Sequence, residues 1–218
     1  MERQGVLFDL DGTLLDSEPI WKAAMASLVR SLAPGAAASV TSGLSGIPTA
    51  EAVALVHSRL GLVRADIREN VDRLEREVAG RQAHDPGWRP GVPELLTGLR
   101  GAGFGTALVT SNSRVIVDGL LAGGLRPLFD TVVCLEDVAR AKPAPDPYRE
   151  AVRRLGLRPG DCVAVEDSAV GVASALAAGC AVVRLGVVGV PHADDVPVVA
   201  NLADLDVSYI RKRLDGVH

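Results

Sequence analysis

The sequence predicts an α/β fold: a Rossmann-like parallel sheet with helices on both faces and an inserted all-helical segment. Three observations lead to this prediction. Short Val-rich runs alternate with helix-like segments from about residue 92 onward. An apolar run near the N-terminus, residues 5–8, stops abruptly at Asp9. The long stretch between these two regions shows only helical periodicity.

The first predicted strand is followed by the helical segment. Residues 5–8 are uniformly apolar and lead into a polar loop, which is typical of a short buried strand. From Glu18 to about Gly80, apolar residues recur three or four positions apart, as on one face of a helix. These residues are Trp21, Met25, Leu28, Val29 and Leu32, then Ala52, Leu55, Val56 and Leu60, then Ile67, Val71, Leu74 and Val78.

The rest of the chain alternates between helix-like and strand-like runs. The helix-like runs are residues 92–99, 115–121, 151–155 and 172–178, and the strand-like runs are 106–109, 131–133, 163–165 and 181–185. Such alternation is typical of a parallel sheet covered on both faces. We expect residues 5–8 to join this sheet, so that residues 1–16 and 83–218 form the α/β core and residues 17–82 an inserted helical domain.

Composition and charge exclude several classes of function. The 218 residues are 48% hydrophobic, and 23 basic against 27 acidic side chains give a net charge of −4. This balance provides no electrostatic footprint for nucleic acid or for an anionic membrane. No apolar run reaches the roughly 20 residues that span a bilayer. The apolar run near the N-terminus is too short for a signal peptide. We expect a soluble protein that is not exported.

The three cysteines, Cys134, Cys162 and Cys180, are widely spaced and stand beside Val or Ala. None belongs to a C-x-x-C pair. A metal site or a disulfide is one interpretation, but small apolar residues in buried strands explain them better. Free cysteines favour a reducing, cytoplasmic compartment.

The sharpest chemical signal is the D-L-D-G-T run of residues 9–13. Asp9 ends the predicted strand, and Asp11 follows two positions later, so both carboxylates can point to the same side. Two nearby carboxylates suit a hard cation, and Gly12 lets the chain turn closely around it. An EF-hand loop also begins with this spacing, but its sixth and twelfth positions are here Leu14 and Ile20. A plain Asp-Gly turn remains the other interpretation.

Glu166 and Asp167 directly follow another predicted strand. Adjacent acids at the carboxyl end of a strand can complete an octahedral magnesium site. The alternative is helix capping, which Asp167 or Ser168 could provide.

Two further elements follow predicted strands. Ser111 and Asn112, after residues 106–109, provide a hydroxyl and an amide near a helix N-terminus, which can hold an anion. The alternative is a helix cap, which Ser113 could supply. Lys142 lies in an A-K-P-A-P-D run, where a solvated side chain is the simpler interpretation. Prolines on its C-terminal side hold the backbone extended, which could aim the amine inward.

Taken in order, these four elements resemble the motifs of the haloacid dehalogenase superfamily, in the branch with β-phosphoglucomutase-like and sugar-phosphatase members. Residues 8–19 (FDLDGTLLDSEP) resemble its opening motif, Ser111-Asn112 its second, residues 142–146 (KPAPD) its third and residues 165–168 (VEDS) its fourth. The resemblance covers nearly the whole chain. One departure is Ala141, where a glycine often precedes the motif lysine.

The resemblance implies roles for these residues. Asp9 would be the nucleophile that forms an aspartyl-phosphate, and Asp11 the acid and base that serves the leaving group and then water. Mg²⁺ would be held by the Asp9 side chain, the Asp11 backbone carbonyl and Asp167, with Glu166 acting through water. The residues that would bind the phosphate are Thr13, Ser111, Asn112 and Lys142. The helical insertion would be a cap domain that closes over the site.

The function implied is a magnesium-dependent phosphatase of small phosphate monoesters, of the sugar phosphate or phosphoglycolate type. A β-phosphoglucomutase-type mutase is the alternative, and a non-catalytic phosphate-binding regulator a weaker one. Mutase members carry another residue where Thr13 stands, and basic groups in the cap, whereas residues 42–49 here are small and neutral. The expected partner is a small phosphorylated metabolite, with no nucleic acid or membrane, and the expected state a monomer or weak homodimer.

Overall fold

A computed structural model describes residues 3–44, 47–62, 66–122, 124–186 and 196–215. Its centre is a six-stranded parallel sheet in the order β3-β2-β1-β4-β5-β6, which confirms the predicted α/β class. The strands are β1 (Gly5–Phe8), β2 (Gly105–Val109), β3 (Thr131–Val133), β4 (Cys162–Glu166), β5 (Ala181–Leu185) and β6 (Val198–Val199). The N-terminal strand is central, because β1 pairs with β2 on one side and β4 on the other.

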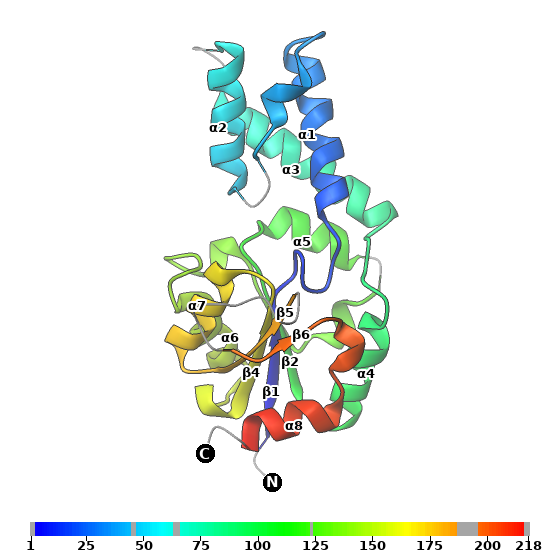
Figure 1. Ribbon diagram of the computed structural model, residues 1–218, viewed down its shortest axis with the longest axis vertical. Coiled ribbons are helices and arrows are strands. Elements are labelled where there is room, and N and C mark those ends of the chain that lie inside the picture. Colours follow the sequence, from blue (N-terminus) through cyan, green and yellow to red (C-terminus); the bar gives the residue numbers. More distant parts are fainter. Residues whose placement is uncertain (1–2, 45–46, 63–65, 123, 187–195, 216–218) are drawn as a thin grey trace.

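Helices cover both faces of the sheet, as Figure 1 shows. One apolar cluster joins the sheet to α4 (Val92–Gly101), α5 (Arg114–Leu121) and α8 (Val207–Asp215), and a second joins it to α6 (Asp146–Leu155) and α7 (Ala169–Ala178). The alternation of strand side chains explains this division. Val6 and Phe8 of β1 belong to the first cluster, and Leu7 between them belongs to the second.

The inserted segment folds as a helical group of its own: α1 (Glu18–Leu32), η1 (Ala38–Thr41), α2 (Thr49–Leu60) and α3 (Ile67–His84). Apolar side chains from these helices form a separate cluster, which also takes in Ile116 of α5. Figure 1 shows the helical group beyond the end of the sheet toward which the strands run. The helical group packs on the core through α3 and α5, where a Cβ added to Gly119 would lie 3.0 Å from Cβ of Ala79.

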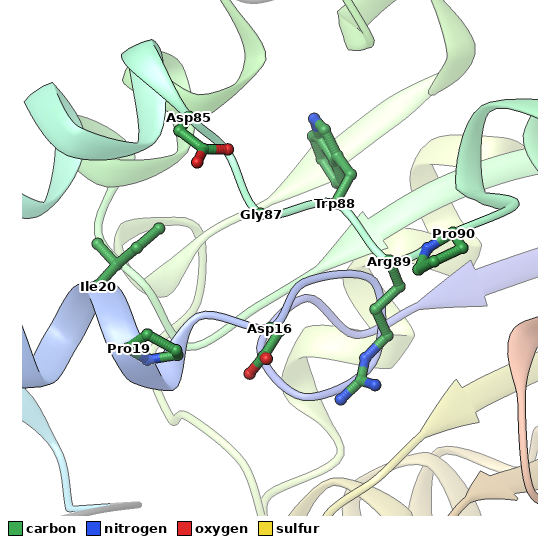
Figure 2. Close-up of a pocket in the computed structure, with 8 residues that line it drawn as sticks. All are labelled: Asp16, Pro19, Ile20, Asp85, Gly87, Trp88, Arg89 and Pro90. Atoms are coloured by element: carbon green, nitrogen blue, oxygen red, sulfur yellow. The ribbon is translucent and has the colours of Figure 1, made fainter.

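Two chain connections join the helical group to the core and pair with each other. The Asp16 amide donates to the Gly87 carbonyl (3.0 Å), the Arg89 amide donates to the Leu14 carbonyl (2.9 Å), and Leu15 forms an antiparallel bridge with Trp88. A pocket of about 440 Å³ lies between the two connections, and its lining residues are drawn in Figure 2. Its lining residues are Asp16, Pro19, Ile20, Asp85, Gly87, Trp88, Arg89 and Pro90, and none of them is among the predicted catalytic residues.

Some features differ from the sequence-based expectation. α3 runs to His84, two residues beyond the boundary expected for the insertion. β6 and α8 were not predicted, because a two-residue strand shows no periodicity and the strand-like pattern had ended at residue 185. The cysteines are free and buried, as expected, and burial raises the pKa of Cys134 and of Cys180 to about 12. Among the described residues, no helix is both long and apolar enough to cross a bilayer.

Candidate active site

The carboxyl ends of the central strands bring the predicted acids together. Asp9 follows β1 directly, and its amide donates to the Val165 carbonyl of β4 (3.0 Å), which continues the parallel ladder. Glu166 is the last residue of β4, and Asp167 follows it. Because parallel strands end at one edge of the sheet, residues that are more than 150 positions apart in the sequence meet there.

A buried lysine lies at the centre of this edge. Lys142 Nζ donates to Asp9 Oδ1 (2.6 Å), to Glu166 Oε1 (2.6 Å) and to the Val109 carbonyl (3.0 Å). These three contacts use all three donors of an ammonium group. The Tyr148 hydroxyl also donates to Glu166 Oε1 (2.6 Å), and its ring centroid lies 5.1 Å from Lys142 Nζ. The lysine therefore points inward, and its charge is fixed against the Asp9 carboxylate.

Burial and like charges perturb the titration of this cluster. Burial, followed by the Glu166 charge, raises the pKa of Asp9 well above its ordinary value, although Lys142 opposes this shift. The same two causes raise the pKa of Asp167 to about 6. Burial alone would lower the pKa of Lys142, but Asp9 and Glu166 raise it above its ordinary value. The site therefore concentrates more negative charge than one lysine neutralises, and a cation would be favoured here.

Asp11 is held by Asn112 and not by the buried lysine. Its Oδ2 accepts a hydrogen bond from the Asn112 side-chain amide (2.6 Å). Burial raises the pKa of Asp11, although hydrogen bonds from Ser17 and Asn112 partly offset the shift. Its Oδ1 is buried and has no hydrogen-bond partner among the described residues. A carboxyl whose pKa is raised and which keeps one oxygen unengaged is suited to carry a proton.

The donor set fits a hard divalent cation. Carboxylate oxygens of Asp9, Glu166 and Asp167 lie within 4.8 Å of one another. Glu166 is less able than the other two to bind a metal ion directly, because Lys142 and Tyr148 already donate to its Oε1. Gly12, with a φ of +78°, leaves room for the Asp167 carboxylate, since a Cβ at this position would lie 1.9 Å from Oδ2. Oxygen ligands from carboxylates are those that Mg²⁺ prefers.

Replacing Gly12 by alanine should displace Asp167 and weaken metal binding. The added Cβ would overlap the carboxylate, and the positive φ is unfavourable for any residue with a side chain. We expect the Mg²⁺ concentration for half-maximal thermal stabilisation to rise by roughly tenfold or more.

Gly98→Ala is the matched control for Gly12→Ala. Gly98 lies on the exposed face of α4, and a Cβ there meets nothing within 4 Å. The control should bind Mg²⁺ like the wild type and melt slightly higher, because alanine is favoured over glycine in a helix. Equal Mg²⁺ responses of the two variants would contradict the assignment of Asp167 to the metal site.

The remaining predicted residues have varied environments. Ser111 is exposed at the end of β2, and the Asn112 amide points at Asp11. Thr13 is fully buried, and its hydroxyl has no partner among the described residues. Ser168 caps α7 by accepting from the Gly171 amide (3.0 Å), as the alternative interpretation proposed. Ser113 occupies the N-cap position of α5, but its side chain makes no capping hydrogen bond, contrary to the capping alternative.

Three residues of the site were missed by sequence reasoning. Tyr148 reads as an ordinary core residue of α6. Ser17 lies in the first connection, and its effect on Asp11 has no local pattern. Gly171 lies in the first turn of α7, where a Cβ would come within 1.9 Å of Glu166 Oε1. Of these three residues, only Gly171 has a visible signal in the sequence, because it follows the acidic pair and Ser168 at the start of a helix.

The parallel sheet and the acidic cluster at its carboxyl edge define an α/β protein with candidate reacting groups after the central strand. The chain belongs to the haloacid dehalogenase-like hydrolase family, whose sequence profile matches residues 4–179. It is 35% identical to hexitol phosphatase A of Escherichia coli over 99% of this chain and 98% of that protein. It is 32% identical to protein CbbY of Rhodobacter capsulatus, covering 84% and 85% of the two chains.

Solved structures support the fold. The crystal structure of CbbY from Rhodobacter sphaeroides in complex with phosphate superimposes with a TM-score of 0.79, covering 96% of this chain and 99% of that one at 24% identity. A β-phosphoglucomutase from Clostridium difficile superimposes with a TM-score of 0.80, covering 98% of each chain at 18% identity. At these identities the likeness shows the architecture alone.

Proposed function

We propose that this protein is a magnesium-dependent phosphatase that hydrolyses small phosphate monoesters. The observation that carries the proposal is the pairing of Asp9 with Lys142 beside Asp11, whose carboxyl can move a proton. Several relatives that are named as phosphatases support hydrolysis of phosphate esters as the reaction class. Besides hexitol phosphatase A, they include a phosphoglycolate phosphatase of Cupriavidus necator at 35% identity over 84% of this chain, and a fructose-1-phosphate phosphatase of Escherichia coli at 30% over 80%.

Asp9 is the nucleophile in this proposal. Its Oδ1 is held by Lys142, which leaves the other oxygen to attack phosphorus in line and form an aspartyl-phosphate. Lys142 favours the ionised form of this carboxylate and so opposes the effect of burial on its pKa. Its positive charge also attracts the phosphate and offsets charge that builds up on the transferring group. Ser111, exposed just after β2, and Asn112 would meet the phosphate oxygens.

Asp11 serves as acid and then as base. In its protonated form it gives a proton to the leaving oxygen, and in its ionised form it takes one from the water that hydrolyses the intermediate. The Asn112 amide orients the carboxyl by holding Oδ2, which leaves Oδ1 to carry the proton. Asp11 is not part of the group of converging metal-ligand oxygens, which leaves its side chain free for proton transfer.

Asp9, Asp167 and the Asp11 carbonyl would hold Mg²⁺, with Glu166 acting through a water molecule. The ion would neutralise negative charge on the phosphate and orient it for attack. The helical group, residues 17–82, would serve as a cap that excludes water and contacts the leaving group. The free, buried cysteines suit a reducing compartment, and we place the enzyme in the cytoplasm.

A phosphate-release assay with added metal tests this function. Purified protein is incubated with p-nitrophenyl phosphate and with sugar and polyol monophosphates. We expect release of inorganic phosphate with Mg²⁺, loss of release with EDTA, and recovery when Mg²⁺ is restored in excess. Ca²⁺ should restore much less, because its longer and looser coordination misplaces the phosphate.

The same assay separates hydrolysis from the mutase alternative. β-Glucose 1-phosphate is supplied with Mg²⁺ and catalytic glucose 1,6-bisphosphate, and glucose 6-phosphate and free phosphate are followed together. Phosphate release from a monoester should exceed isomerisation. Glucose 6-phosphate forming much faster than phosphate from any ester would make the chain a mutase, and full activity after exhaustive chelation would exclude the metal site.

A further inference from the structure

A hydrogen bond connects the helical group to the loop that follows β2. The Ser113 hydroxyl donates to Glu75 Oε2 of α3 at 2.8 Å. Ser113 stands at the N-cap position of α5 but does not cap it. The first amide of that helix, from Arg114, instead donates to the Glu136 carboxylate (3.0 Å to each oxygen). The serine hydroxyl is therefore available to fix a carboxylate of the helical group.

The packing of α3 against α5 holds Glu75 in this position. Glu75 and Ala79 are four residues apart and lie on the same face of α3. Ala79 meets α5 at Gly119, where a Cβ would lie 3.1 Å from the Ala79 carbonyl oxygen. The two helices thus approach closely one turn away from the Ser113–Glu75 contact, and the half-buried carboxylate has a defined place.

The loop that follows β2 connects Glu75 to the proposed leaving-group side of the site. Asp11 gives its proton to the leaving oxygen in the proposed reaction, so the leaving group must lie beside Asp11. The Asn112 amide holds Asp11, and Ser113 is the next residue. Glu75 is therefore linked to the acid–base group through two consecutive residues of one loop.

The charge around Glu75 is predominantly negative. Asp72 and Glu136 are close enough to raise its pKa, together with the larger effect of burial. Arg114, the nearest cation along the loop, is ion-paired with Asp137. An anionic leaving group would approach these acids at an unfavourable potential, whereas hydroxyl groups can donate to a carboxylate.

Two cations of the helical group, Lys22 and Arg59, are engaged elsewhere. Lys22 pairs with Glu18 on the exposed side of α1 (2.8 Å). Arg59 donates to the carbonyls of Val40 and Ser42 (2.8 Å each). Both side chains therefore have their partners inside the helical group, and neither offsets the charge of Glu75.

We propose that Glu75, held by Ser113, is a specificity-determining residue that selects phosphate esters of neutral hydroxylated alcohols over esters whose leaving group carries a carboxylate or a second phosphate. This inference rests on the proposed phosphatase function and names its substrate class.

Two esters of matched size test the proposal: 2-hydroxyethyl phosphate, whose leaving group is neutral, and 2-phosphoglycolate, whose leaving group is anionic. The assays use the full chain with Mg²⁺ at pH 8, so that Glu75 is ionised. The wild type should have the higher kcat/KM for the neutral ester. Glu75→Gln should raise relative kcat/KM for the anionic ester by about fivefold, equivalent to roughly 1 kcal/mol.

Glu69→Gln is the matched control, since it removes the same charge from an exposed position of the same helix. It should leave the selectivity ratio unchanged. A second measurement needs no variant. Raising ionic strength should reduce the wild-type preference for the neutral ester, because salt screens the charge of a half-exposed carboxylate.

The outcomes separate the two proposals. No phosphate release from either ester, or from p-nitrophenyl phosphate, would overturn the phosphatase function itself. Release with equal or greater kcat/KM for 2-phosphoglycolate would overturn only the role of Glu75. An identical selectivity ratio in wild type and Glu75→Gln, with both proteins folded by thermal melting, would do the same. A selectivity that does not change with salt would also count against it.

Discussion

Asp9→Asn should reduce the kcat for phosphate release by roughly 10³-fold or more, because the amide is a poor nucleophile toward phosphorus. The fold should persist. The backbone amide of Asp9 keeps its bond to Val165, and an asparagine oxygen can still accept from Lys142. Removing a charge that is strained by burial and by Glu166 should leave the melting temperature unchanged or higher.

Trapping the intermediate distinguishes loss of chemistry from loss of binding. Acid quenching of the wild type during turnover of a labelled ester should recover label on the protein, and Asp9→Asn should recover none. Asp118→Asn, the same chemical change at an exposed position of α5, is the control and should label normally. If Asp9→Asn keeps even a tenth of the wild-type kcat, the covalent mechanism is wrong.

Lys142→Met should lower both activity and stability. Methionine has a similar length to lysine but carries no charge. Among the described residues, Lys142 is the only cation in contact with the two buried carboxylates of Asp9 and Glu166. Leaving buried charges uncompensated costs about 3–5 kcal/mol. We also expect kcat to fall by roughly 10²-fold or more, because a preorganised charge beside the phosphate is lost.

The pH dependence of this variant has a defined sign. An acid whose pKa is raised in the folded state stabilises the fold at low pH and loses that contribution as pH rises through its folded pKa. Lys142 opposes the raised pKa of Asp9, so its removal strengthens the effect. Thermal melts should therefore show a larger loss for Lys142→Met at pH 8 than at pH 5.

Lys212→Met, at an exposed position of α8, is the matched control and should change neither activity nor stability appreciably. A Lys142→Met protein with near wild-type stability at pH 8 and more than a tenth of wild-type kcat would contradict the role assigned to the lysine.

Much of the architecture follows from local patterns. Every strand-like run lies within an observed strand, because each is a short apolar segment between turn residues. The helical spacing of residues 18–80 likewise predicted α1, α2 and α3. The order of strands in the sheet has no local signal, since β1 pairs with residues about 100 and 157 positions further along. β6, with two residues, is formed by its pairing with β5 rather than by its own sequence.

The site residues also divide into those with a local signal in the sequence and those without one. Asp9, Lys142, Glu166 and Asp167 stand at strand ends or in loops, where a polar residue after an apolar run is visible in the sequence. The structure brings them together, while their catalytic roles stay predictions. Tyr148 and Glu75 lie inside helices, where periodicity accounts for them as core and surface residues. Only the packing of α6 and α3 reveals which polar atoms they meet.

The central place of β1 has a consequence for how the chain acquires its fold during synthesis. Gly5–Phe8 is synthesised well before its two neighbours, which begin at Gly105 and Cys162. β1, which Asp9 follows, therefore cannot pair along both of its edges until the chain has been made through β4. The helices of residues 18–84 make mainly local contacts and can form during that interval. Asp9 is thus translated long before the two strands that fix its position in the sheet.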